Sequence, residues 1–449
     1  MNRKAFVDKA FLLLIGALSF LSVEAHSQLS KSSPFLVNKV QIQISADKSS
    51  SENTFGLALI KSDCFKNQEQ LLPQWLRTNQ FPPEGLSARS VAFSLRDVSE
   101  KMIQLEVDNP CILGFDNDGI AYSTRWNDPL LNDQLFLPYI GFQNYQLRFE
   151  SPLFKDLKPV IVAVVDSGVS QSHPDFLGRF WRSEGNQIGY NFIDSNFEVE
   201  DGLGHGSHVA GLISAVSNNG VGGVGISQAV RLMILKTQDD SGRGSVGDVA
   251  DAIRFAADQG ADVINLSLAI QGNPSLIREA VDYALEKGCF LVASAGNSGA
   301  EITPSNFVSP AGLAPTRPGL VSVASVDSES GVLSSFSNRS NVYTEVAAPG
   351  SHGSKQILST YKNERYFSLA GTSMSAPQVA GAVAQIISYF KSYKSPLLNV
   401  EIERFLLDHS KTNERLLPFV KLGKELDLDA ISQSLVHHHQ LSSDGGLDE

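Results

Sequence analysis

Residues 160–168 read Val160-Ile-Val-Ala-Val-Val-Asp-Ser-Gly168, a short apolar run that ends in a carboxylate and a turn. Similar runs follow at Arg231 to Lys236, Val263 to Leu268 and Phe290 to Ser294. Between these runs, apolar residues recur at helical spacing from Val246 to Ala257 and from Leu276 to Ala284. This alternation predicts an α/β fold, a parallel sheet with helices on both faces, whose ligand site lies at the carboxyl ends of the strands.

Three polar residues stand where such a site is expected. Asp166 ends the first apolar run, and a buried carboxylate there needs partners. His205 lies in Asp201-Gly-Leu-Gly-His-Gly-Ser-His-Val-Ala-Gly211, and Ser373 lies in Gly371-Thr-Ser-Met-Ser-Ala-Pro-Gln-Val-Ala-Gly381. Both segments predict a glycine-led turn into a helix, so we expect the imidazole and the hydroxyl near helix N-terminal amides.

These residue types together indicate nucleophilic catalysis. A serine hydroxyl becomes a nucleophile when a neutral imidazole accepts its proton and a carboxylate holds that imidazole in one tautomer. With the chain order Asp, His, Ser, the three segments resemble the subtilisin-like serine peptidases (subtilases), over roughly Asn127 to Leu435. The resemblance implies a three-layer subtilisin-like fold and an endopeptidase with the catalytic triad Asp166, His205 and Ser373. One departure is Ser207, where the family usually has threonine.

The resemblance implies further site residues. Asn297, in Ser294-Ala-Gly-Asn-Ser-Gly299, matches the family's oxyanion asparagine, which acts with the backbone amide of Ser373. An asparagine merely tolerated in a turn is the alternative. Substrate peptides are expected to pair as extended strands with two edges, which map onto Ser267-Leu268-Ala269 and Gly242-Arg243-Gly244.

A calcium site is the one metal site that the resemblance implies. Asp175 and Asn218 match two ligands of a structural Ca²⁺ site found in many relatives, and oxygen ligands suit that ion. A surface aspartate and a turn asparagine are the alternatives. The chemistry itself requires no cofactor.

The predicted peptidase domain spans residues 125–435. The two segments that precede it indicate export and processing. Arg3, Lys4 and Lys9 precede an apolar run from Ala10 to Leu21, which indicates a signal peptide over residues 1–25 rather than a lasting membrane anchor. Residues 26–124, with a helix expected at Ser99 to Val107, resemble the family's small α+β inhibitory propeptides. We expect the end of this segment to occupy the substrate cleft as a strand until the enzyme cuts it between about Ile120 and Asn127.

The charge composition limits the kinds of molecule that this protein is expected to bind. The formal net charge of −12 and the pI near 5.3 argue against a nucleic-acid partner, which leaves protein or peptide substrates and the chain's own propeptide.

Among three cysteines, Cys64 with Cys111 is the expected disulfide, and Cys289 is expected to be buried and unpaired. The tail, residues 436–449, is polar and is predicted to be disordered. The predicted location is secreted, in the medium, the periplasm or the envelope.

Three rival interpretations stay open from the sequence. His205 and His208 could form a metal pair, but no third ligand accompanies them, so His208 is expected to be a packed, hydrogen-bonded core residue. A non-catalytic binding or chaperone protein of the same fold is a second rival. An esterase is the third, since the same residues cleave activated esters.

Overall fold

The computed structural model describes residues 41–44, 55–61, 88–94, 103–106, 112–117, 127–149, 157–393 and 395–443. The chain divides into two compact units, Met1–Tyr122 and Ser123–Glu449. The predicted signal peptide, Cys64 and Cys111 lie outside the described residues. Among the helices that are described, none is long and apolar enough to cross a membrane.

The described residues of the first unit are strands. β1 (Gln41–Ile44) pairs antiparallel with β4 (Ile103–Glu106), and β2 (Phe55–Lys61) lies between β3 (Ala88–Ser94) and β5 (Ile112–Asn117) in an antiparallel sheet. The helix predicted at Ser99 to Val107 is therefore wrong. Ile103, Leu105 and Val107 alternate with polar residues at period two, which is the period of a strand.

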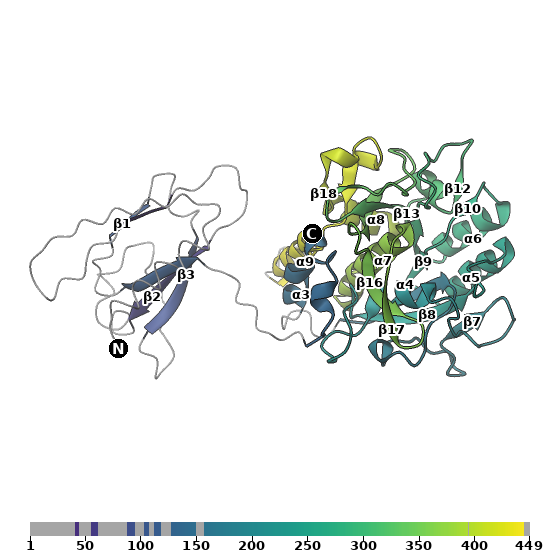
Figure 1. Cartoon of the computed structure of the whole chain (residues 1–449), viewed down its shortest axis with the longest axis horizontal. Helices are drawn as coiled ribbons and strands as arrows, with labels where there is room; N and C mark the ends of the chain where they lie inside the picture. The colour runs from purple at the N-terminus through teal and green to yellow at the C-terminus, as the bar shows by residue number, and fades with distance from the viewer. Residues whose placement is uncertain are drawn as a thin grey trace, which may run out of the picture. The chain divides into compact units, whose positions relative to one another are not determined.

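The second unit is built on a ten-stranded sheet (Figure 1). Its neighbours run in the order β18-β19-β15-β13-β11-β9-β6-β8-β7, and β14 pairs with β13. All these pairs are parallel except β18–β19 and β13–β14. The strands are β6 (Val160–Asp166), β7 (Gly189–Asn191), β8 (Val230–Lys236), β9 (Val263–Leu266), β11 (Phe290–Ser294), β13 (Leu320–Asp327), β14 (Val332–Leu333), β15 (Val346–Ser351), β18 (Lys411–Thr412) and β19 (Lys424–Glu425). This arrangement confirms the predicted α/β class with a mostly parallel sheet.

Two small antiparallel pairs accompany the main sheet. β16 (Ile357–Tyr361) and β17 (Arg365–Leu369) form a hairpin, and β10 (Ile270–Gln271) pairs with β12 (Val308–Ser309). The helices are α3 (Phe142–Phe149), α4 (His205–Ser214), α5 (Val246–Asp258), α6 (Ser275–Glu286), α7 (Thr372–Ser392), α8 (Asn399–Asp408) and α9 (Leu428–Ser443). Short 3-10 turns lie at Leu131–Asp133, Pro138–Ile140, Pro174–Phe176, Ala311–Thr316, Glu414–Leu416 and Lys421–Gly423.

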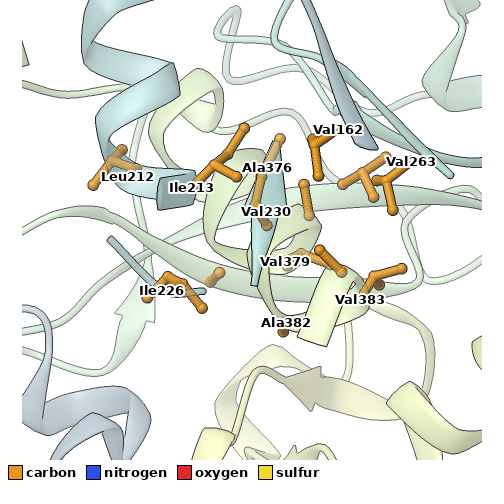
Figure 2. Close-up of a cluster of buried hydrophobic side chains, with 14 of the residues drawn as sticks. Val162, Leu212, Ile213, Ile226, Val230, Val263, Ala376, Val379, Ala382 and Val383 are labelled. Atoms are coloured by element: carbon orange, nitrogen blue, oxygen red, sulfur yellow. The ribbon is translucent and has the colours of Figure 1, made fainter. Parts of the chain in front are cut away.

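Helices cover both faces of the sheet because its strands are apolar on both. In β6, Val160, Val162 and Val164 join the core cluster that contains α4 and α7, whereas Ala163 and Val165 join the cluster that contains α5 and α6. Figure 2 shows the first cluster, in which Leu212 and Ile213 of α4 and Ala376, Val379, Ala382 and Val383 of α7 surround strand valines. Such burial on both faces is typical of a parallel sheet between two helical layers.

The strand order reverses beside β6, and this reversal places the site. The chain runs from β6 to β8 on one side and then crosses to β9 on the other. In open α/β sheets, ligands bind in the crevice outside the carboxyl ends of the strands at such a switch point. Asp166 is the last residue of β6, and Ser267 follows the last residue of β9.

The predicted tail needs a correction. Disorder was predicted from residue 436, but α9 continues to Ser443. Leu428, Ile431 and Leu435 are fully buried at helical spacing, and the His438 ring packs at 4.9 Å from Phe390 and 5.9 Å from Tyr389 of α7. The helix continues past residue 435 because α7 supplies partners for its polar-looking end.

Candidate active site

Asp166 and His205 form a close pair at the carboxyl end of β6. Asp166 is fully buried, and its Oδ1 accepts a hydrogen bond from the backbone N–H of Ser167 at 2.8 Å. The same oxygen lies 2.7 Å from Nδ1 of His205, the first residue of α4. Because Nδ1 faces the carboxylate, Nε2 is the ring nitrogen left to exchange protons. The His205 side chain keeps 23 % of its surface exposed, so the ring is within reach of solvent and substrate.

The charges around His205 raise the pKa of its imidazole above the ordinary value of 6.5. Burial opposes the charged form and is the largest single effect. The negative charge of Asp166, its hydrogen bond to the ring, and the charge of Asp201 together outweigh it. The site therefore favours the protonated imidazole more than water does.

Asp201 holds the start of α4, although the sequence reasoning did not single it out. Its Oδ1 accepts from the backbone N–H groups of Leu203 and Gly204 at 3.1 and 2.7 Å and from Ser167 Oγ at 2.8 Å. Its Oδ2 accepts from the backbone N–H and the hydroxyl of Ser207 at 2.8 and 2.7 Å. An aspartate four residues before the histidine, across two glycines, was the available signal.

The side chain of Ser207, the departure from the family pattern, makes two hydrogen bonds through its hydroxyl. The oxygen donates to Asp201 and accepts from the backbone N–H of Ser170 at 2.8 Å. Threonine carries the same group at the same position, so both of these contacts are open to either residue.

Ser373 is the second residue of α7, beside the backbone that follows β9. Its Oγ donates to the backbone oxygen of Ser267 at 3.1 Å, and Ser267 Oγ donates to the backbone oxygen of Ser373 at 3.0 Å. Among the described residues, Ser373 Oγ makes no hydrogen bond to the His205 ring. Catalytic hydrogen bonds are often long or misaligned in the absence of substrate. The missing bond is therefore compatible with Ser373 and His205 acting together. The N-terminal end of a 21-residue helix favours negative charge at the hydroxyl.

Asn297 lies opposite the start of α7 on the loop after β11. Its Oδ1 accepts from both the backbone N–H and the hydroxyl of Thr372, each at 2.9 Å. This pair of bonds fixes the orientation of the amide, and in the described part of the chain Nδ2 has no protein partner. A side chain at Gly371 would approach Nδ2 to 3.2 Å, so glycine keeps this space open.

The two predicted substrate edges differ in what their backbones offer. Ser267, Leu268 and Ala269 follow β9 directly beside Ser373. Gly242, Arg243 and Gly244 lie in the loop between β8 and α5, where the Arg243 N–H donates to Asp239 Oδ1 and the Arg243 carbonyl accepts from the Asp239 N–H. Arg243 thus uses its own backbone inside the loop, and the Gly242 N–H donates to the Asp239 carbonyl, which leaves the Gly242 carbonyl and the Gly244 backbone as the candidates for pairing.

The predicted calcium ligands are not brought together as expected. Asn219 rather than Asn218 contacts Asp175, through Nδ2 to Oδ1 at 2.8 Å, and Tyr366 donates to Asp175 Oδ2 at 3.0 Å. Burial raises the pKa of Asp175 to about 6. Both oxygens of the nearby Asp128 also accept backbone bonds, from the N–H groups of Asn218 and Asn219. Protein donors take up part of the capacity of these carboxylate oxygens, each of which can accept more than one bond, and the calcium site stays a prediction.

Two residues are structural, as their sequence context predicted. His208 is fully buried, and its Nε2 lies 3.0 Å from the backbone oxygens of both Ile357 and Phe367. Cys289 is 1 % exposed and donates to the Ala261 carbonyl, and burial raises the pKa of its thiol to about 12. Neither environment suits a reactive or metal-binding group, and no cluster of three or more potential metal ligands occurs within the described residues.

Comparisons with known proteins identify the family of the chain. The model of the subtilase family matches residues 158–424. The chain is 33 % identical over 308 residues to the thermophilic serine proteinase of Bacillus sp. (strain AK1), covering 68 % of this chain and 69 % of that protein. It is 39 % identical over 263 residues to thermitase of Thermoactinomyces vulgaris, covering 57 % of this chain and 86 % of that protein.

Solved structures give the same answer for the fold. A protease structure from Pseudoalteromonas arctica PAMC 21717 superposes with a TM-score of 0.57 at 25 % identity, over 70 % of this chain and 100 % of that one. A cold-adapted subtilisin-like serine proteinase superposes with a TM-score of 0.50 at 28 % identity, over 60 % of this chain and 89 % of that one. The chain belongs to the subtilase family of serine endopeptidases.

Proposed function

We propose that this chain is a secreted endopeptidase, made as a precursor, that hydrolyses peptide bonds through Ser373, His205, Asp166 and Asn297. The observation that carries the proposal is the 2.7 Å contact between Asp166 Oδ1 and His205 Nδ1 at the switch point of the sheet. Ser373 lies at the same edge, because it contacts the residue that follows β9.

The proposed reaction is acyl transfer. Ser373 Oγ turns from the Ser267 carbonyl toward His205, attacks the peptide carbonyl carbon, and passes its proton to His205 Nε2. The imidazolium, held and stabilised by Asp166, then gives that proton to the leaving amine, and the C–N bond breaks. Water repeats the sequence on the acyl-enzyme, releasing the acid and restoring the serine hydroxyl. No cofactor is needed for these steps.

The oxyanion is stabilised by donors that are already in place. Thr372 holds the Asn297 amide by its oxygen, so Nδ2 is available to donate, and the backbone N–H of Ser373 lies in the first turn of α7. Donors fixed in advance cost no reorganisation when negative charge develops on the carbonyl oxygen. The substrate is an extended peptide that pairs with Ser267 to Ala269 and with the glycines of Gly242 to Gly244.

The precursor part of the proposal rests on the division of the chain at Tyr122 and Ser123. The enzyme itself cuts between about Ile120 and Asn127, after removal of residues 1–25 on export to the medium, periplasm or envelope. N-terminal sequencing of the exported protein should begin inside this interval. A start far outside it, or normal processing of isolated Ser373→Ala precursor, would contradict self-processing.

Turnover of matched substrates tests the endopeptidase assignment. We expect purified, matured protein to cleave casein and an extended peptide anilide, with Ser373→Ala inactive on both. Hydrolysis of small activated esters without cleavage of casein would indicate an esterase instead. Binding of casein without cleavage of any substrate would indicate a non-catalytic protein.

A further inference from the structure

Four consecutive residues of the β16–β17 hairpin bind the backbone on both sides of His205. Their side chains donate to carbonyl oxygens: Ser359 to His208 at 2.9 Å, Thr360 to Ser207 at 2.7 Å, Tyr361 to Leu203 at 3.0 Å, and Lys362 to Gly202. Two of these acceptors precede His205 and two follow it. From Gly202 to His208, the hairpin therefore donates to every backbone carbonyl except the three at the centre of the segment.

Tyr361 reaches closest to that centre. Besides its bond to the Leu203 carbonyl, its ring lies against Gly204, where an added Cβ would come within 2.4 Å of the ring. Gly204 has φ +98° and immediately precedes His205. The residue that the Tyr361 ring contacts is therefore joined to His205 by a single peptide bond. The Tyr361 ring is itself backed by Phe367 of β17, with ring centroids 5.1 Å apart.

The same hairpin is tied to the other end of the site. His208 Nε2 lies 3.0 Å from the carbonyl oxygens of Ile357 on β16 and Phe367 on β17, so α4 bridges both strands. β17 ends at Leu369, four residues before Ser373. The element that contacts the segment of His205 is thus continuous with the one that carries Ser373.

We propose that Tyr361 is a positioning residue that sets the place of His205 between Asp166 and Ser373, acting through the Leu203 carbonyl and Gly204. This inference rests on the proposed function of the triad. Tyr361 touches neither the reacting atoms nor His205 itself. Its hydroxyl fixes the backbone one peptide before the turn, and its ring prevents that turn from moving outward.

The expected signature is kinetic. Proton transfer and attack depend steeply on geometry, whereas substrate affinity depends on edges that Tyr361 does not form. Loss of the hydroxyl should therefore lower kcat by roughly 3- to 30-fold and leave KM within about twofold. Loss of the whole ring should lower kcat further.

The pH profile should also move. The charged or titratable groups that face His205 are Asp166 on β6, Asp201 on the preceding loop and His208 on α4. Asp166 raises the pKa of the imidazole by a bond that depends on the position of the ring. If the turn shifts, that attraction weakens, and the acidic limb of kcat/KM moves to lower pH.

The test compares Tyr361→Phe and Tyr361→Ala with Tyr283→Phe, a matched control. Tyr283 on α6 donates to the Asp258 carboxylate at 2.6 Å, so this control removes a tyrosine hydroxyl and its hydrogen bond from an element that does not carry the site. Active sites are titrated with a fluorophosphonate before kcat, KM and the pH profile are measured on one peptide anilide, so that unfolded protein does not count.

The expected result is a fall in kcat from wild type through Tyr361→Phe to Tyr361→Ala, with an acidic limb at lower pH, and unchanged values for Tyr283→Phe. The inference would be overturned if Tyr361→Phe had the same kcat and the same acidic limb of the pH profile as wild type. It would also be overturned if the substitution changed only KM, or only the fraction of active sites that the fluorophosphonate labels. If wild type itself is not labelled, the proposed function fails instead, so the two failures are distinguishable.

Discussion

His205 and His208 lie three residues apart on α4, yet their surroundings give them opposite properties. His205 faces a carboxylate, keeps part of its ring exposed and has a raised pKa. His208 is fully buried against two carbonyl oxygens, and burial lowers its pKa to about 3. Burial and charged partners, rather than residue type or helix position, thus decide which histidine exchanges protons.

Removal of His205 should have the largest effect. His205→Ala leaves Ser373 without a base, and general base action of this kind is worth roughly 10²–10⁴-fold in rate. We expect kcat on a peptide anilide to fall by at least that factor, with folding retained by circular dichroism. Residual activity above a tenth of wild type would remove His205 from the catalytic role.

Two asparagines should differ in the same way, with Asn297 acting in catalysis and Asn338 in structure. Asn297 has an oriented amide with a donor to spare, whereas Asn338 donates to the Ala295 carbonyl and accepts from the N–H groups of Ser298 and Ala300. We expect Asn297→Ala to lower kcat by about 10²–10³-fold with little change in KM. Asn338→Ala serves as the control and should lower the melting temperature instead. Equal losses of kcat per titrated site would contradict the oxyanion assignment.

Substitution of His208 should affect stability more than chemistry. His208→Leu leaves the Ile357 and Phe367 carbonyls without their shared donor, which costs about 1–3 kcal/mol when a buried acceptor is left unpaired. Urea unfolding in a Ser373→Ala background, which prevents self-digestion, measures this loss. A variant as stable as its background would show that the buried bonds contribute nothing.

The smallest expected effect is the difference between the pH titrations of His205 and His208. His205 needs its proton removed to act as a base, and its raised pKa means that removal occurs above pH 6.5. Activity should therefore rise with pH through an apparent pKa above 6.5. In proton NMR of Ser373→Ala, His205 should titrate there, while His208 stays neutral until the protein unfolds in acid. A titration of His208 near 6.5 would contradict the comparison.

The sequence predicted the site well where local pattern and position in the fold coincide. The run from Val160 to Asp166 indicated a buried strand with a carboxylate at its end, and β6 has those bounds. The structural role of His208 was predicted because no third metal ligand accompanies His205 and His208 in the sequence.

Predictions failed where tertiary contacts or single backbone angles decide. Asn218 adopts φ +60°, and it is Asn219 whose amide bonds Asp175, which residue spacing alone does not reveal. The end of α9 is polar in sequence, but α7 supplies aromatic partners for it. Tyr361 carried no motif, because its contacts to the His205 segment span more than 150 residues of sequence.

The role of Ser373 as the nucleophile can be tested by finding the site of covalent labelling. Matured wild type is treated with a fluorophosphonate, digested and analysed by mass spectrometry, beside Ser373→Ala and His205→Ala. We expect one adduct, on Ser373, formed rapidly in wild type, slowly in His205→Ala and not in Ser373→Ala. An adduct on another serine, or equal labelling of wild type and His205→Ala, would contradict it.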